Sequence, residues 1–546
     1  MTDLFSKVIT NALIFLVITG CDFSKNNDDA EALVHKGLVG AWYHSSDLTR
    51  IGSSMWLGKP DVHWDVISGR GNSWSAQWEG YITVPVSGKV NFYAESDRQI
   101  IVEIDGAQAL HIGGSDDNKE KCTLTMTKDQ NYPIRIIYMQ HKEGTPFFRV
   151  LWSWENHEKQ VIPANVLGFT QKQADWWNYR KKPDPSAFDF SKLNIIPAQH
   201  HIVYGASGRY AGWPANNGIW SWGNEILVGY NLGYHDPDVS GGHAIRSDMP
   251  DSVVLSRSLD GGETWNLEKD ANFSGTSVIS PGFDFSDPDF AMRIRNDSYF
   301  ASTDRGKSWQ GPFIIKILTK GGNEITALTS RTDYLITGPS ECLVFFSVET
   351  GLVEADYQDR SFCAVTKDGG KTFHFLGWMT ENTDTRSVMS STVSIAGDHL
   401  VSVMRRKHEQ RYDDKPAFVS NWIEAAESRD SGVTWNALGK IAETDQGERN
   451  GNPPALVKLK DKRLCVAYGY RGYPYGIHMK TSSDNGRTWS NEYVIRHDGA
   501  TWDVGYPRIT INDKGYLVLV YYFTTKEHYE QYIAVSIIDP AELNVD

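Results

Sequence analysis

The sequence predicts an all-β protein in which an N-terminal β-sandwich is followed by a six-bladed β-propeller. Two observations lead to this fold class. Short strand-like segments separated by turn residues fill residues 35–169, and no long amphipathic helix pattern interrupts them. Further along the chain, five copies of the pattern S/T-x-D-x-G-x-T/S-W/F recur at intervals of about 45–65 residues, which indicates an array of similar β-units.

The N-terminal residues have the pattern of an export signal. Within residues 1–20, Lys7 precedes an apolar run at 12–18 that is too short for a permanent membrane span. Small residues directly before Cys21 resemble a bacterial lipobox, which implies cleavage before Cys21 and a diacylglycerol on its sulfur. Residues 21–34 are polar and acidic and are predicted to form a flexible tether. We expect an exported protein that a lipid on Cys21 anchors to a membrane of the bacterial cell envelope, with plain secretion as the alternative.

Residues 35–169 are predicted to form the β-sandwich. Strand-like runs alternate there with turn signals such as Asp105-Gly106, and this spacing is typical of a sandwich or barrel. The segment also contains the motifs GLVGAWY from Gly37, WEGYI from Trp78 and PVSGKVNF from Pro85. It resembles the protective-antigen-type β-sandwich of bacterial toxins, glycosidases and adhesins, which implies either carbohydrate binding or a spacer role.

One position of this segment departs from the resemblance. In the sugar-binding members, two adjacent Asp residues help to hold calcium. This sequence has Asp97-Arg98 at that place. Because Ca²⁺ prefers several oxygen ligands and a guanidinium opposes it, we expect no metal site there.

The five repeated patterns each describe a tight turn. Asp can hydrogen-bond its own backbone and Gly can adopt a positive φ, so together they form the turn, and the aromatic residue then begins the next strand. The copies begin at Ser258, Ser302, Thr366, Ser428 and Ser482. We interpret them as a folding device without chemistry of their own.

A second repeated pattern completes the propeller, which is predicted at residues 195–546 after a proline-containing linker at 170–194. It consists of a strand, a tight turn and a second apolar strand, and its clearest copies are 217–231, 391–406, 454–471 and 508–522. Each such hairpin with its Asp turn gives about four strands per unit and six units in all. The last unit lacks one strand, and residues 201–204 are predicted to supply it and close the ring.

The composition excludes several kinds of function. The chain has 546 residues, a net charge of −14 and no Lys/Arg-rich block, so nucleic acid is not an expected partner. The five cysteines show no metal-binding spacing, and no phosphate-binding loop or nucleophilic serine motif is present, so we expect no cofactor. An anionic substrate would need a local cluster of arginines to overcome the overall negative field.

Residues 195–546 resemble the sialidase superfamily, whose Asp boxes have the pattern of the five turns. The resemblance implies three arginines that bind a carboxylate, an Asp acid/base and a Tyr nucleophile assisted by a Glu. The chemistry is consistent, because a guanidinium binds a carboxylate with two parallel hydrogen bonds and a Tyr nucleophile avoids repulsion by an anionic sugar.

The resemblance assigns these roles to particular residues. Arg209, Arg471 and Arg508 match the substrate-binding arginines. Asp236 follows the first hairpin, where the acid/base is expected, and Tyr522 or its neighbour Tyr521 matches the nucleophile.

The position of the assisting glutamate departs from the family pattern, because it is occupied by Pro453. Glu424, or Glu448 from a neighbouring loop, is the candidate replacement. Four histidines near the first unit offer a different chemistry, in which a His and a Tyr abstract and donate protons while Arg neutralises a uronate carboxylate. They are His200, His201, His235 and His243.

The leading hypothesis is an exported glycoside hydrolase of sialidase type that releases a terminal, acidic sugar from extracellular glycans. The first alternative is another exo-glycosidase or a uronate polysaccharide lyase on the same propeller. The second is a non-catalytic surface lipoprotein that binds glycans.

Overall fold

The structure is a computed structural model of the chain. It describes residues 32–43, 51–63, 74–113, 118–140, 146–174, 188–238, 242–268, 273–319, 321–326, 328–349, 359–381, 385–412, 415–445 and 451–543, and the structural statements below concern these residues. The predicted signal peptide and Cys21 lie outside them, as does Glu448. In the described part, no helix is long and apolar enough to cross a membrane.

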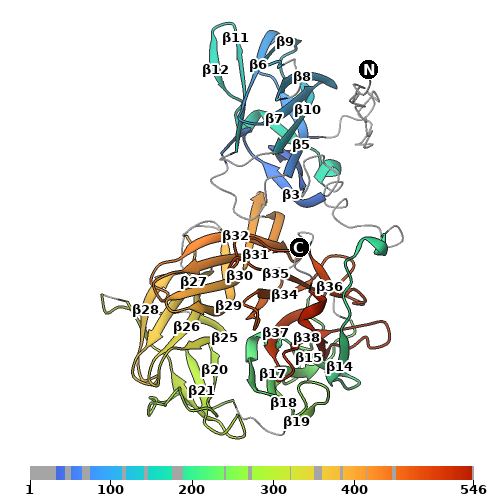
Figure 1. Cartoon of the computed structure of the whole chain (residues 1–546). Helices are drawn as coiled ribbons and strands as arrows, with labels where there is room; N and C mark the ends of the chain where they lie inside the picture. Colours follow the sequence, from blue (N-terminus) through green and yellow to red (C-terminus); the bar gives the residue numbers. More distant parts are fainter. Residues whose placement is uncertain are drawn as a thin grey trace, which may run out of the picture.

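The N-terminal domain is a β-sandwich of two antiparallel sheets (Figure 1). The first sheet contains β1 (His35–Lys36), β2 (Leu38–Tyr43), β3 (Ile51–Leu57), β5 (Trp74–Thr83), β7 (Gln99–Ile104), β8 (Ala107–Ile112), β10 (Asn131–Gln140) and β13 (Leu167–Phe169). The second contains β4 (Asp61–His63), β6 (Gly88–Ser96), β9 (Lys121–Met126), β11 (Phe147–Trp154) and β12 (His157–Val161), and the 3₁₀ helix η1 (Ala164–Val166) precedes β13.

Alternation along the strands explains how the sandwich forms its core. In β7, Ile100, Val102 and Ile104 are buried, and the residues between them are half-buried. This period of two places every second side chain on the inner face. Trp78 and Trp152 come from opposite sheets and are both buried in the same core.

Asp97 has its oxygens engaged within the protein. Oδ1 accepts hydrogen bonds from the backbone N–H of Phe147 at 2.8 Å and from Tyr138 Oη at 3.1 Å. Oδ2 lies 2.8 Å from Arg98 Nη1. Asp97 Oδ2 is therefore paired with the guanidinium of Arg98.

The strands from Gln199 to Ile538 form six sheets in the described part of the chain, which are the blades of the propeller. Blade 1 has β15 (Arg209–Gly212), helix α2 (Pro214–Asn217), β16 (Ile219–Trp222), β17 (Glu225–Tyr234), β18 (Ser252–Ser258) and β19 (Asn266–Glu268); blade 2 has β20 (Ala291–Arg295), β21 (Ser298–Ser302) and β22 (Gln310–Ile314). Blade 3 has β25 (Leu328–Ile336), β26 (Cys342–Glu349), β27 (Asp359–Thr366) and β28 (Phe373–Trp378), extended by β23 (Ile317–Leu318) and β24 (Glu324–Ile325).

The remaining blades follow in chain order. Blade 4 has β29 (Arg386–Ala396), β30 (His399–Tyr412), β31 (Lys415–Ser428) and β32 (Asn436–Glu443); blade 5 has β33 (Pro454–Lys458), β34 (Leu464–Tyr470), β35 (Gly476–Ser482) and β36 (Tyr493–Arg496). Blade 6 has β37 (Gly505–Ile511), β38 (Leu517–Phe523), β39 (Tyr532–Ile538) and β14 (Gln199–Tyr204). The 3₁₀ helices η3 (Phe190–Lys192) and η4 (Pro540–Glu542) flank the ring.

The predicted closure of the ring is confirmed. Strand β14, from the start of the propeller, pairs antiparallel with β39 from its end, and His201 lies opposite Val535. The predicted all-β fold class, with a sandwich and a six-bladed propeller, is confirmed with it.

Each Asp pattern forms the turn between the last two strands of its blade. In the first copy, Asp260 Oδ1 accepts hydrogen bonds from the hydroxyl of Ser258 at 2.8 Å and from the N–H of Thr264 at 2.9 Å. The backbone N–H of Gly262 donates to Ser258 Oγ, and Gly262 has a φ of 102° that favours glycine. Burial would raise the pKa of Asp260, but its hydrogen bonds outweigh burial and lower it to about 2.

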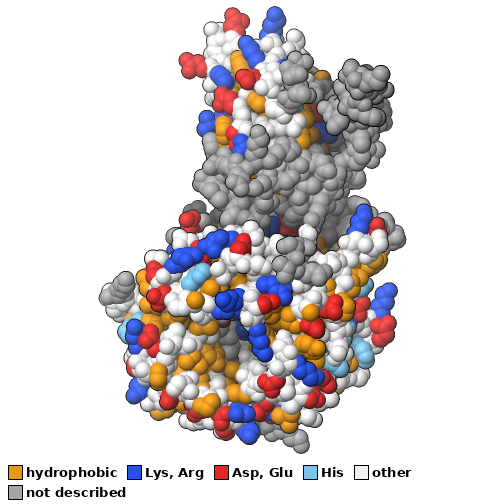
Figure 2. All heavy atoms as spheres, in the orientation of Figure 1, with side chains coloured by type: hydrophobic (Ala, Val, Ile, Leu, Met, Phe, Trp, Pro, Cys, Tyr) orange, Lys and Arg blue, Asp and Glu red, His pale blue; other side chains and the backbone are white. Residues whose placement is uncertain are grey.

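The surface of the propeller is mixed in charge on the face seen in Figure 2, where acidic and basic side chains are interspersed. The net charge of −14 is therefore not gathered into one patch on that face. Among the described cysteines, Cys342, Cys363 and Cys465 are buried free thiols and Cys122 is half-buried.

Candidate active site

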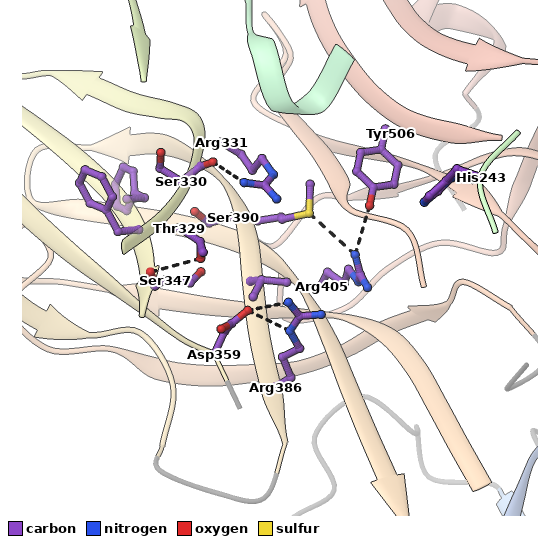
Figure 3. A pocket seen from close by; sticks show the side chains of 14 residues that line it. His243, Thr329, Ser330, Arg331, Ser347, Asp359, Arg386, Ser390, Arg405 and Tyr506 are labelled. Atoms are coloured by element: carbon purple, nitrogen blue, oxygen red, sulfur yellow. Dashed lines mark hydrogen bonds and ion pairs between the residues drawn. The ribbon is translucent and has the colours of Figure 1, made fainter. Parts of the chain in front are cut away.

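A cavity of about 190 Å³ lies where the first strands of blades 3, 4 and 6 begin. Its residues come from the starts of β25, β29 and β37 and from the neighbouring strands β26, β27 and β30 (Figure 3). The first strand of each of these blades contacts the first strand of the blade beside it in the ring. Residues far apart in the sequence thereby meet at one place near the propeller axis.

Three β-bulges shape this cavity. The pairing register shifts between Ser330 and Tyr334 in β25, between Val388 and Ser391 in β29, and between Gly505 and Arg508 in β37. Two residues that line the cavity sit in these bulges with left-handed backbones, Met389 at a φ of 58° and Tyr506 at a φ of 48°. Bulges turn side chains away from their regular direction, and such strained residues concentrate at functional sites.

Three arginines line the cavity: Arg331, Arg386 and Arg405. Arg386 forms an ion pair with Asp359, whose Oδ2 accepts from Arg386 Nη2 at 2.6 Å and from Nε at 3.0 Å. Asp359 is the only carboxylate among the described residues that line the cavity. The guanidinium groups therefore outnumber the carboxylates, and the cavity can accept an anion.

Arg331 and Arg405 make few hydrogen bonds within the described part of the protein. Nη1 of Arg331 donates to the carbonyl of Ser330 at 2.6 Å, and Nη1 of Arg405 lies 3.4 Å from the hydroxyl of Tyr506. In both residues Nε is buried and has no partner among the described residues. Burial lowers the pKa of Arg331 to about 10, which an incoming anion would reverse.

Tyr506 lies among these cations. Its side chain is 9% exposed, and the guanidinium of Arg471 lies 5.3 Å from the centre of its ring. Burial alone would raise the pKa of Tyr506, but the charges of Arg405, Arg471, Arg331 and Arg386 outweigh burial and lower it. The arginines thereby stabilise the phenolate, which is a nucleophile or a base, relative to that of an ordinary tyrosine.

His243 lies beside Tyr506 at one end of the cavity (Figure 3). Its Nδ1 is 2.6 Å from Oδ1 of Asp503, which is 2% exposed. Burial would raise the pKa of Asp503, but the hydrogen bond from His243 and the charges of His243 and Arg471 lower it. The cavity thus holds arginines, a tyrosine and a carboxylate-bound imidazole.

Arg471 and Tyr522 are brought together beside this cavity rather than into its lining. Arg471 Nη2 donates to Tyr522 Oη at 2.7 Å, and Tyr522 Oη donates to Asp503 Oδ1 at 2.5 Å. Both side chains are buried, and burial raises the pKa of Tyr522 well above its ordinary value. Tyr521 is also buried and bonds Ser536, on the side of β38 that faces blade 5.

The other predicted site residues lie apart from the cavity lining. Arg508 donates to the carbonyls of Ala215 and Arg331 from Nη2. Arg209 stacks on Tyr234, with its guanidinium 4.3 Å from the ring centre.

Asp236 and Glu424 are each engaged by their own surroundings. Asp236 Oδ1 accepts from the N–H of Asp238. Glu424 is ion-paired with Arg406 and accepts a hydrogen bond from Trp422 Nε1. Their predicted roles stay predictions, and the geometry of the cavity favours other residues.

Sequence reasoning missed Arg331, Arg386, Arg405, Asp359 and Tyr506. Arg405 ends the apolar strand of the 391–406 hairpin, so its position equivalent to Arg471 was a usable signal. Tyr506 stands two residues before Arg508 at a bulge, and no local pattern marks it. Among the histidines, the structure places His243 in the cavity lining.

Comparison with known protein families agrees with this architecture. Residues 68–165 match the PA14 domain, and residues 286–519 match the BNR repeat-like domain. The first match lies in the sandwich and the second in the propeller. These two matches are to the kinds of module that the resemblance to the protective-antigen sandwich and to the sialidase superfamily implied. Among curated proteins, no sequence matches the chain.

Solved structures with similar folds include three of different kinds. A protein of unknown function from Dyadobacter fermentans is 20% identical over 64% of this chain and 100% of that chain, with a TM-score of 0.47. The NanB sialidase from Streptococcus pneumoniae is 11% identical over 93% and 95%, with a TM-score of 0.42. The α-L-arabinofuranosidase Arb93A from Fusarium graminearum is 12% identical over 64% and 98%, with a TM-score of 0.37. Values this low do not transfer an activity to this chain.

Proposed function

We propose that the propeller is a glycoside hydrolase whose cavity binds a terminal acidic sugar. The observation that carries the proposal is the meeting of Arg331, Arg386 and Arg405 with Tyr506 in one cavity. In a protein with a net charge of −14, such a local cluster of arginines attracts an anion that the overall charge would repel. Because guanidinium groups match the geometry of a carboxylate, a sugar acid is the ligand that fits best.

The size of the cavity supports a terminal sugar. Its volume of about 190 Å³ is below the roughly 300–1,000 Å³ of sites for drug-sized ligands. One sugar ring matches that space better than several consecutive rings of a polymer. This favours an exo-acting enzyme that removes one residue from the end of a glycan.

Tyr506 is the nucleophile in this proposal. Its oxygen would attack the anomeric carbon while the bond to the leaving oxygen breaks, and water would then release the sugar from the tyrosine. The sialidase resemblance implied a glutamate that activates the tyrosine, and Pro453 stands at that position. Here the positive field of the arginines around Tyr506 takes over that activation, because it favours the phenolate.

The experiment is hydrolysis of methylumbelliferyl glycosides of N-acetylneuraminic acid and glucuronic acid by the purified protein. Arg405→Ala and Tyr506→Phe are expected to lower kcat/KM by about 100-fold or more, since each removes a group that acts on the reacting sugar. Arg487→Ala and Tyr529→Phe are the matched controls, because both side chains lie on the surface away from the cavity. Equal losses in pocket and control variants, or none in either, would refute the site.

A uronate lyase is the second candidate. It draws support from His243 and Tyr506, which line the same cavity and could act as an acid–base pair while an arginine neutralises the carboxylate. A lyase product contains a new carbon–carbon double bond, so ultraviolet absorbance without uptake of water would favour it over hydrolysis. A glycan-binding protein would bind the sugar acid and form neither product.

The location outside the cytoplasm is also a proposal, which rests on the sequence before residue 22. We expect the wild type in the membrane fraction of a bacterial host and Cys21→Ala in the soluble exported fraction. Fractionation with an antibody against the propeller measures this. If Cys21→Ala is found in the same fraction as the wild type, the proposed lipid anchor is refuted.

A further inference from the structure

We propose that His243 transfers the proton to and from the glycosidic oxygen, and that Asp503 is the positioning residue that orients it. This inference rests on the proposed function, because it concerns the same cavity. No sequence motif marks the pair: 260 positions separate the two residues, and they meet because the 242–251 loop of blade 1 lies against the segment that leads into β37 of blade 6.

The geometry fixes which nitrogen faces the ligand. His243 Nδ1 is engaged by Asp503 Oδ1 at 2.6 Å. The imidazole therefore has Nε2 left for chemistry, and His243 lines the cavity beside Tyr506. Its side chain is 31% exposed, against 3% for Asp503, so the imidazole can reach a ligand and the carboxylate cannot.

Asp503 is built into the core as a fixed acceptor. Oδ2 accepts from the backbone N–H of Ala244 and from Gln531 Nε2, both at 3.3 Å. Oδ1 also accepts from Tyr522 Oη at 2.5 Å. A carboxylate with several donors has little freedom to rotate, so its bond to His243 sets the direction of the ring.

Two aromatic rings hold the imidazole from the sides. The ring of Trp213 lies 5.1 Å from His243 in an edge contact, and that of Trp502 lies 5.5 Å away in a tilted one. Trp213 has a left-handed backbone with a φ of 59°. Such a conformation is strained and persists where the surroundings impose it, as they do at functional sites.

The proton balance of the reaction follows from this arrangement. As Tyr506 bonds to the anomeric carbon, the bond from that carbon to the leaving oxygen breaks, and the Nε2 proton of His243 passes to the leaving oxygen. In the second half, a water oxygen bonds to the anomeric carbon, its proton returns to Nε2, and the tyrosine oxygen leaves. His243 is thus the proton donor of the first half of the reaction and the proton acceptor of the second.

Several other groups share the electrostatic environment of His243. Asp503 contacts it directly, Tyr506 and Arg405 line the same cavity, and Tyr210, Tyr522 and Arg471 surround Asp503. A change in the pH dependence of the rate could arise from any of these groups. For that reason the test uses variants of the pair itself and compares leaving groups.

The test compares two substrates of the acidic sugar that the wild type cleaves: the methylumbelliferyl glycoside, whose leaving group needs little protonation, and the methyl glycoside, whose leaving group needs it. His243→Asn retains an amide near the Nδ1 position for Asp503 but has no Nε2. We expect it to lose about 100-fold or more on the methyl glycoside and less than about tenfold on the methylumbelliferyl glycoside.

Two further variants separate chemistry from folding. In Asp503→Asn, kcat/KM should fall more for the methyl glycoside than for the methylumbelliferyl glycoside, since the imidazole loses the carboxylate that orients it. His399→Asn is the matched control, because His399 also bonds a carboxylate, Glu427 at 2.9 Å, but lies outside the cavity lining. It should leave the leaving-group ratio unchanged. Equal losses of His243→Asn on both substrates would overturn the role of His243.

A readout without turnover distinguishes this inference from the proposed function. In the full chain labelled with ¹⁵N-histidine, the Nε2 resonance of His243 should shift when N-acetylneuraminate or glucuronate binds, and Asp503→Asn should alter its Nδ1 resonance. A wild type that cleaves no acidic glycoside would refute the proposed function. If the chemical shift of Nε2 does not change when either ligand is added, the role of His243 is refuted even if turnover is found.

Discussion

Tyr506 owes its chemical character to residues that are distant in the sequence. Arg331, Arg386, Arg405 and Arg471 come from blades 3, 4 and 5 and together outweigh the effect of burial on its pKa. In the sequence, Tyr506 stands between Gly505 and Pro507, and neither neighbour indicates an altered pKa. The resemblance led us to expect arginines and a tyrosine. The cavity contains these residue types at other positions, because the positions depend on which blades face each other.

The arginine field makes a prediction about pH. In Arg405→Gln, the acid limb of kcat/KM should move to higher pH. The sign follows because Arg405 lowers the pKa of Tyr506, so its removal raises that pKa and the phenolate forms only at higher pH. The measurement is the pH–rate profile with the methylumbelliferyl substrate. Arg487→Gln serves as the control, and an unshifted limb in Arg405→Gln would show that the protonation state of Tyr506 does not govern the rate.

Arg508, which the sequence predicts to bind substrate, donates hydrogen bonds to backbone carbonyls in the structure. Its Nη2 bonds the carbonyls of Ala215 and Arg331, and it lies near Asp333, whose pKa is raised to about 6 chiefly by burial. It therefore connects helix α2 of blade 1 to the backbone of a cavity residue in blade 3.

We expect Arg508→Ala to lower the free energy of unfolding by about 2 kcal/mol, because two carbonyls lose a charged donor. Urea denaturation measures this. Arg246→Ala should cost less than about 0.5 kcal/mol, since Arg246 only pairs with the exposed Asp248 at the surface. A loss of turnover in Arg508→Ala without any loss of stability would instead support direct contact with substrate.

At the level of elements, the turns were predictable and the bulges were not. The residues of an Asp turn are consecutive in the sequence, so its five copies identify the last two strands of five blades. The bulges in β25, β29 and β37 carry no such signature, because Met389 and Tyr506 adopt left-handed backbones without glycine. Tertiary packing, rather than local preference, imposes those conformations.

The Asp turns make a prediction about stability. Asp260→Ala removes an acceptor of several hydrogen bonds, and we expect a loss of about 1–3 kcal/mol at neutral pH. Because the pKa of Asp260 falls from 3.8 to about 2 on folding, its contribution is present above pH 3.8 and is lost as pH falls toward 2. Urea midpoints of wild type and variant should therefore converge in acid. Asp248→Ala is the surface control, and a constant difference at all pH values would contradict the assignment.

At the level of the whole molecule, the sequence was most informative about architecture. It predicted two β domains, six blades and a first strand that closes the ring, because each unit has a countable pattern and one unit was a strand short. It could not predict the cavity, since the angular order of blades around the axis decides which inner strands meet. The proposed active site is a property of the closed ring, in which β37 of blade 6 lies opposite blades 3 and 4.

Closure should therefore control the stability of the whole propeller. Val203 in β14 is 5% exposed, while its neighbour Ile202 is 50% exposed, because successive residues of a strand point to opposite faces. Val203→Asp buries a charge against β39 and should cost about 3 kcal/mol or more, whereas Ile202→Asp should cost less than about 1 kcal/mol. Thermal denaturation measures the difference, and hydrogen exchange should show faster opening of β39 in Val203→Asp. Equal midpoints in the two variants would mean that the pairing of β14 with β39 does not hold the ring. If Val203→Asp also weakens binding of the sugar acid while Ile202→Asp does not, then closure supports the cavity as well as the fold, because Tyr506 and Asp503 belong to or directly precede the blade that β14 completes.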